Sequence, residues 1–179
     1  MNSYDNSSKK ALLIIDMINN FDFSNGEILA KKTLSIAQTI KKLKEQFIRL
    51  ELPIIYINDH YNLWQADVTR IINHCENPLS KDIISIIHPQ PDDLFLIKPK
   101  HSAFFGTALN TLLYQLKVRS LVITGIAGNI CVLFTANDAY MREYMIHVPQ
   151  NAIASTDDQD NEYALKMIKN VLKGDINPL

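Results

Sequence analysis

Five short and almost uninterrupted apolar runs recur along the chain, and segments with a helical spacing of apolar residues separate them. The runs occupy residues 11–15, 54–57, 94–97, 121–124 and 145–148. A strand that is apolar on both faces needs cover on both sides, which parallel sheets receive from their crossover helices. The pattern therefore predicts an α/β domain with three layers, α/β/α, around a doubly wound and mainly parallel sheet.

The segments between the runs carry apolar residues three or four positions apart, which is typical of a helix with one buried face. The clearest of them spans about residues 28–50 and ends before Pro53. Shorter helices are predicted at 65–75, 80–87, 107–116, 129–142 and 160–172. A closed eight-unit barrel takes about 250 residues, and the 179 residues of this chain favour an open sheet instead.

Neither a repeat nor a linker divides the sequence, so we expect a single domain over residues 1–179, with a flexible tail at residues 1–9. The net charge of −1 disfavours a nucleic acid or an anionic membrane as partner. No apolar run approaches the roughly 20 residues of a membrane span, and the polar start lacks the apolar core of a signal peptide. We therefore expect a cytoplasmic protein whose partner is a small molecule.

Side chains that could take part in catalysis or binding follow four of the apolar runs. They are Asp16, Asp59, Lys98 and, seven residues beyond Thr124 at the start of the next predicted helix, Cys131. Ligands of an open parallel sheet bind beyond the carboxyl ends of its strands. The topology alone therefore predicts that these side chains gather at one edge of the sheet.

These residue types have the chemistry of a thiol hydrolase. A helix N-terminus and a nearby lysine both stabilise a thiolate, so we expect the pKa of Cys131 to lie below its usual value of about 8.5. Asp16 can accept the thiol proton and later return it to a leaving amine. The segment from Gly125 to Cys131 contains two glycines and offers backbone N–H groups for an oxyanion hole.

Plainer interpretations of the same residues remain open. A cysteine among apolar neighbours is compatible with core packing, Asp16 can cap a turn, and Lys100 is as eligible as Lys98. The second cysteine, Cys75, has no metal-ligand spacing with His74 and is interpreted as a packing residue. Two cysteines without an export signal do not indicate a disulfide framework.

Three blocks of sequence carry a more specific signal. They are ALLIIDMINNF at residues 11–21, LIKPKHSAFFGT at 96–107 and LVITGIAGNICVLFTANDAY at 121–140. In this order they resemble the isochorismatase-like cysteine hydrolases, the family that includes nicotinamidases and N-carbamoylsarcosine amidases. The resemblance extends from residue 11 to about 154 and implies a Rossmann-like fold with catalytic Asp16, Lys98 and Cys131. It favours Lys98 over Lys100, because the family's lysine precedes the Ser-Ala-Phe segment by several residues.

The same resemblance implies further site residues. The backbone amides of Ala127 and Cys131 would form the oxyanion hole, with a cis peptide bond before Ala127. Phe21 matches an aromatic residue that lines the substrate pocket of relatives, Trp64 is a second candidate wall, and Asp59 is a candidate substrate-binding residue. Relatives usually assemble, so we expect a homo-oligomer, either a dimer or a tetramer.

One departure from the family concerns a metal. Nicotinamidases carry an Asp-x-His pattern after the second strand, together with a further histidine, for a metal that binds the substrate. Here Tyr61 stands two residues after Asp59, His60 is adjacent instead, and only His74 remains available. The resemblance with this departure implies no metal and no cofactor, and it disfavours nicotinamide as the substrate.

The sequence therefore predicts a cysteine-dependent hydrolase of a small-molecule amide or related C–N bond, acting through a covalent thioester intermediate. Isochorismatases proper act on an enol ether and tend to lack the cysteine, so the presence of Cys131 favours amide chemistry. Two alternatives stay open: an ether or ester hydrolase on the same scaffold, and a non-catalytic protein that binds a small molecule.

Overall fold

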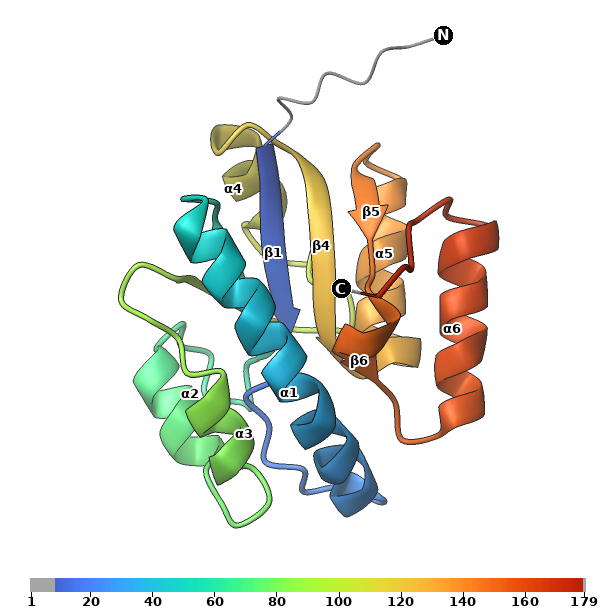
Figure 1. The fold of residues 1–179 in the computed structure, drawn as a ribbon. Coiled ribbons are helices and arrows are strands. Elements are labelled where there is room, and N and C mark those ends of the chain that lie inside the picture. The colour runs from blue at the N-terminus through green and yellow to red at the C-terminus, as the bar shows by residue number, and fades with distance from the viewer. Residues whose placement is uncertain (1–8, 179) are drawn as a thin grey trace, which may run out of the picture.

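The computed structural model describes residues 9–178, and a parallel sheet forms its centre (Figure 1). The strands described are β1 (Lys9–Ile15), β2 (Ile54–Asp59), β3 (Leu94–Lys98), β4 (Val118–Ile126), β5 (Met145–His147) and β6 (Ile153–Ala154). They pair in the order β3-β2-β1-β4-β5, β6 adds to β4, and every pairing is parallel. The strand order reverses between β1 and β4, which is where open sheets form their ligand crevice.

Helices cover both faces of the sheet, which confirms the predicted three-layer fold (Figure 1). They are α1 (Gly26–Arg49), α2 (Val68–Cys75), α3 (Lys81–Ile86), α4 (Leu109–Gln115), α5 (Leu133–Tyr140) and α6 (Asp158–Asn170). Apolar residues of α1, α2 and α3 join one core cluster. Those of α4, α5 and α6 join the other, so the chain deposits its first three helices on one face and its last three on the opposite face.

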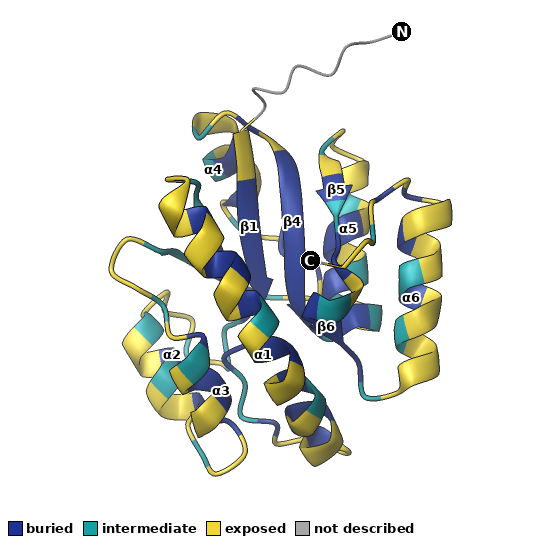
Figure 2. Ribbon diagram, in the orientation of Figure 1, coloured by how far each residue is buried: buried dark blue, intermediate teal, exposed yellow. Residues whose placement is uncertain are grey.

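The alternation of side chains along β1 explains why its residues 11–15 are all apolar. Leu12 and Ile14 belong to the cluster beneath α1, whereas Ala11, Leu13 and Ile15 belong to the cluster on the opposite face. All five are at most 1% exposed. Because successive side chains of a strand point to opposite faces, the part of β1 that is covered on both sides needs an apolar residue at every position. Figure 2 shows that most of β1 is buried.

The predicted elements are all present, with ends shifted by a few residues. The helix predicted at 129–142 differs in kind, because it begins as a π-helical turn, Gly128–Val132, before α5 starts. The short strand β6 and the 3₁₀ turn Gln150–Ala152 before it are absent from the prediction, since two or three residues carry no periodic signal. The predicted tail lies outside the described residues except for Lys9, which begins β1. Within residues 9–178, no helix has the length and apolar character needed to cross a membrane.

Candidate active site

The carboxyl ends of β1 to β4 meet at one edge of the sheet and carry the predicted side chains there. Asp16 directly follows β1, and its N–H donates to the carbonyl of Ile57 in β2. Asp59 and Lys98 end neighbouring strands and are register partners. Cys131 lies in the π-helical turn that follows β4. The parallel register therefore brings the four residues to one edge, as the strand-end pattern predicted.

A buried lysine joins the carboxylate to the thiol. The ammonium of Lys98 lies 2.8 Å from Oδ2 of Asp16 and 3.5 Å from Sγ of Cys131, and it also donates to the backbone carbonyl of Lys100 at 3.1 Å. An ammonium has three donors, so these partners satisfy all of them. Lys98 is 2% exposed whereas the side chain of Lys100 is exposed, and this settles which lysine stands at the sheet edge.

The Asp16 carboxylate is held from several sides. Oδ1 accepts the backbone N–H of Asp59 at 2.8 Å, while Oδ2 faces Lys98. The Cys131 thiol, which Lys98 contacts as well, lies close enough to this carboxylate for each group to affect the pKa of the other. Asp16 itself adopts a positive φ of 50°, which turns the chain away from the end of β1 and leaves the carboxylate at the edge. A base, a cation and a thiol therefore share one contact network.

The prediction that the pKa of Cys131 is lowered is wrong. Burial raises the pKa of this thiol to about 12, and the neighbouring Asp16 carboxylate adds to the increase although Lys98 opposes it. Burial also raises the pKa of Asp16 above its usual value, against the effect of Lys98. Burial alone would lower the pKa of Lys98, but Asp16 and Cys131 more than reverse this effect, and the ammonium remains protonated. The resting site therefore holds a thiol beside its base rather than a preformed thiolate.

The turn that carries Cys131 is anchored by residues that sequence reasoning missed. The Ile126–Ala127 peptide bond is cis, as the resemblance implied. The N–H of Asn129 donates to the hydroxyl of Ser155 at 3.0 Å, and that hydroxyl donates to Oδ1 of Asn161 at 2.7 Å. Ser155 directly follows β6, the strand without a periodic signal, so no sequence pattern could have identified this anchor.

Gly125 shows how closely the two central strands approach at the site. Its φ is +113°, a region that favours glycine. A Cβ on Gly125 would lie 2.1 Å from the carbonyl oxygen of Ile15. The first glycine of the predicted loop is therefore required by the packing of β4 against the end of β1.

A cavity of about 450 Å³ opens beside the thiol. Five predicted residues line it, namely Asp16, Asp59, Lys98, Ala127 and Cys131. The sequence interpretation missed other lining residues, including Asn19, Asn20, Asp22, Phe23, Tyr61 and His101. Most of them lie in irregular segments after the strands, where only the three-dimensional path of the chain decides which side chains face inward.

The two predicted aromatic walls lie elsewhere. Phe21 is 3% exposed, packs into the core cluster beneath α1 and lines a neighbouring hollow, while Phe23 lines the cavity beside the thiol. Trp64 is 64% exposed and stacks on His60 at a centroid distance of 3.9 Å. Both belong to turns with positive φ angles, which redirect the side chains in a way that spacing cannot predict.

The residues at the place of the family's metal do not form a ligand set. The ring of Tyr61 contacts that of His74 at 5.3 Å, and its hydroxyl donates to the carbonyl of Ile18 at 3.1 Å. Oδ1 of Asp59 accepts the backbone N–H of Tyr61. Within residues 9–178, no group of three or more histidine, cysteine, aspartate or glutamate side chains could hold a metal ion. The phenol of Tyr61 therefore stands at the position where the Asp-x-His pattern has its histidine.

Comparison with known proteins gives consistent matches over the whole domain. The family model of the isochorismatase domain matches residues 10–174. The isochorismatase family protein YaaI of Bacillus subtilis is 64% identical over 167 residues, which cover 93% of this chain and 92% of YaaI. The crystal structure of the nicotinamidase SaPncA from Staphylococcus aureus superposes with a TM-score of 0.74 at 26% identity, covering 95% of this chain and 98% of that one. N-carbamoylsarcosine amidase from Thermoplasma acidophilum gives a TM-score of 0.69 at 29% identity, covering 95% and 96%.

Proposed function

Because the chain belongs to the isochorismatase family of hydrolases, we propose that it cleaves a small-molecule amide or related C–N bond with Cys131 as nucleophile. The observation that carries the proposal is the position of the Lys98 ammonium, 2.8 Å from the Asp16 carboxylate and 3.5 Å from the Cys131 sulfur. Two of the structural relatives are named as a nicotinamidase and an amidase, which supports C–N cleavage.

In the first half of the proposed reaction, Asp16 accepts the thiol proton of Cys131 while Lys98 stabilises the thiolate. The sulfur attacks the carbonyl carbon of the amide and forms a tetrahedral intermediate. In this proposal the backbone amides of Ala127 and Cys131 donate to its oxyanion, an effect worth about 3–4 kcal/mol for a well-aimed donor. The C–N bond then breaks, Asp16 donates its proton to the departing amine, and a thioester remains on Cys131.

In the second half, a water molecule attacks the thioester and Asp16 accepts its proton. The C–S bond breaks, the carboxylic acid leaves, and the proton returns to the Cys131 sulfur. One amide and one water are thus converted into one acid and one amine, and the enzyme is unchanged.

The raised pKa of Cys131 supports a proton transfer that accompanies the attack. At neutral pH the thiol holds its proton, so reaction requires the base to act when the carbonyl arrives. Asp16 and the thiol both contact the Lys98 ammonium and influence each other's pKa, which supports Asp16 as the group that accepts the proton. A thiol that ionises only during attack is also protected from side reactions between turnovers.

The test is mass spectrometry of the intact protein after rapid quenching with a panel of primary amides, carbamoyl compounds and vinyl ethers. We expect an acyl adduct on the wild-type protein and on Cys75→Ala, the matched control, because Cys75 is a buried thiol outside the cavity. The adduct and turnover should disappear in Cys131→Ala. An adduct that persists in Cys131→Ala overturns the proposal, and turnover of vinyl ethers without amides would identify an ether hydrolase instead.

A further inference from the structure

The cavity beside the thiol is lined by more carboxylates than cations. Asp16, Asp22 and Asp59 line it, and Lys98 is the one lysine or arginine among its described lining residues. Lys98 is already paired with Asp16 at 2.8 Å. The remaining nitrogen base is His101, whose exposed ring contacts Phe134 at 5.7 Å. The described lining therefore holds three carboxylates against one ammonium, and that ammonium forms its ion pair with Asp16.

Asp59 carries the charge that lies nearest to the reacting groups. It ends β2 beside Lys98, is half-buried, and donates its backbone N–H to Asp16. Its side chain accepts the N–H of Tyr61 through Oδ1 at 2.8 Å, a contact that leaves the negative charge in place. Among the residues that the structure describes, neither Asp59 nor Asp22 forms an ion pair. The side-chain charge can thus be removed without touching the backbone contact that holds Asp16.

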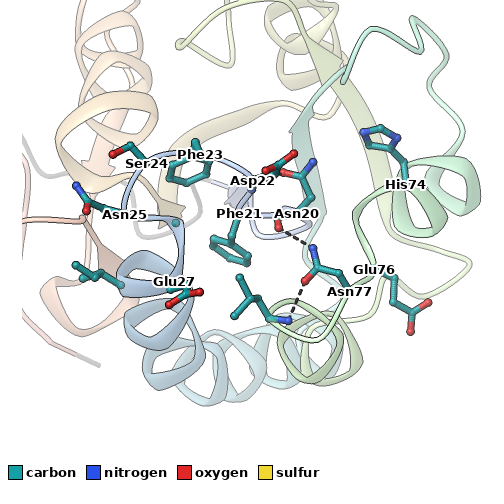
Figure 3. Close-up of a pocket in the computed structure, with 13 residues that line it drawn as sticks. Asn20, Phe21, Asp22, Phe23, Ser24, Asn25, Glu27, His74, Glu76 and Asn77 are labelled. Carbon is teal, nitrogen blue, oxygen red and sulfur yellow. Dashed lines mark hydrogen bonds between the residues drawn. The ribbon is translucent and has the colours of Figure 1, made fainter.

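The surface that continues from this cavity is acidic as well. A neighbouring hollow of about 1080 Å³ shares Asn20, Asp22 and Phe23 with it. The hollow adds the carboxylates of Glu27 and Glu76, and its described lining includes neither lysine nor arginine (Figure 3). A substrate approaching along the segment at residues 20–23 therefore meets negative charge both in the hollow and in the cavity.

We infer that the substrate is a small amide without an anionic group, that amides bearing a positive charge are preferred, and that Asp59 determines this selection. The inference rests on the proposed function, because it concerns the substrate of the same thiol. A substrate carboxylate would lose water on entering the cavity and would face Asp59 and Asp22 without a free cation to pair with. An ammonium or other cationic group would instead be attracted by both.

The substrate arm of the test uses three amides of matched length: β-alaninamide, which is cationic, butyramide, which is neutral, and succinamate, which is anionic. Ammonia release gives kcat/KM for each. We expect the value for β-alaninamide to exceed that for succinamate by at least about tenfold, with butyramide between them. The ratio should shrink in Asp59→Asn and stay unchanged in Asp92→Asn, a matched control whose carboxylate is exposed and outside the cavity.

A second arm measures the charge at Cys131 without relying on turnover. Methanethiosulfonates with an aminoethyl or a sulfonatoethyl group each react with a thiolate by forming a mixed disulfide and releasing methanesulfinate. The ratio of their rates, divided by the ratio for free 2-mercaptoethanol, reports the local charge. We expect the cationic probe to be favoured by at least about tenfold at low salt, and less at high salt or in Asp59→Asn. Cys131→Ser should remain unlabelled.

The outcomes separate the two proposals. Equal or faster reaction of succinamate and of the anionic probe would overturn the charge selection while leaving amide hydrolysis intact. A preserved preference for cations in Asp59→Asn would overturn the role of Asp59. If the probes show the expected preference but no amide acylates Cys131, the proposed function fails, and the inference about its substrate fails with it.

Discussion

Replacing the buried lysine tests the electrostatics of the site most directly. Lys98→Met removes the ammonium and keeps a side chain of similar length. The ammonium lies 3.5 Å from the Cys131 sulfur, and two unit charges at that distance interact by about 5 kcal/mol at an effective dielectric constant of 20. Since each 1.36 kcal/mol is a factor of ten, the thiolate population should fall by more than about a thousandfold.

The assay is the rate of Cys131 alkylation by iodoacetamide at pH 9, followed by intact mass. A more basic thiolate is also a better nucleophile, which offsets about half of the fall in thiolate population on a logarithmic scale. We therefore expect the alkylation rate to fall by about a hundredfold. Lys100→Met is the matched control, because the exposed side chain of Lys100 is replaceable while its backbone carbonyl still accepts from Lys98. Its alkylation rate should equal that of the wild type.

Alkylation of Lys98→Met within about threefold of the wild-type rate would refute the reasoning. Loss of the ammonium also leaves Asp16 buried without its partner, which costs about 3–5 kcal/mol of stability. The double variant Lys98→Met/Asp16→Asn removes both charges and should regain most of that loss in a urea titration. Rates are therefore compared only for variants whose unfolding midpoint shows that they are folded at the assay temperature.

Three further outcomes are expected. Asp16→Asn removes the carboxylate that raises the pKa of Cys131, so alkylation of Cys131 at pH 9 should accelerate while amide turnover falls by about 10²–10⁴-fold. Slower alkylation would contradict the effect of the Asp16 charge on the pKa of Cys131. Burial raises the pKa of Cys75 to about 12. Its contribution to stability is therefore full below the usual thiol pKa of about 8.5 and is lost as the pH rises towards 12. Urea titrations at pH 8 and pH 11 should show a smaller alkaline loss of unfolding free energy in Cys75→Ala than in the wild type, and an equal loss would count against this prediction. Lys44→Met removes the ammonium that lies 2.6 Å from the Asp93 carboxylate and should lower the free energy of unfolding in urea by about 3–5 kcal/mol. The kcat of the folded variant should stay unchanged, because both residues lie outside the cavity.

The sheet and its polar edge could be predicted from sequence because both depend on local patterns. The run from Ala11 to Ile15 is apolar at every position, which requires cover on both faces and thus a parallel sheet. Once the strands are parallel, their carboxyl ends share an edge, and Asp16, Lys98 and Cys131 lie at or beyond three of those ends.

The direction in which the site shifts the pKa of Cys131 could not be predicted from the sequence. The predicted decrease in the pKa of Cys131 was based on a helix N-terminus and a nearby lysine, two features that residue spacing can indicate. Its pKa is instead raised by burial and by the Asp16 carboxylate, and both depend on how tightly distant segments pack around the sulfur. The selection of Phe23 over Phe21 as a cavity wall depends likewise on the turn taken by the backbone at residues 19–25.

The sequence by itself determined the fold class, the order of the longer helices and strands and the identity of the residues at the sheet edge, because hydrophobic periodicity and strand ends are properties of neighbours in the chain. Only the tertiary structure decided that Ser155 anchors the turn carrying Cys131, that the thiol rests protonated, and that Asp22 and Asp59 of the cavity form no ion pair within residues 9–178. Burial, distance and unpaired charge belong to pairs of segments far apart in the sequence, and they acquire values only when the sheet brings those segments together.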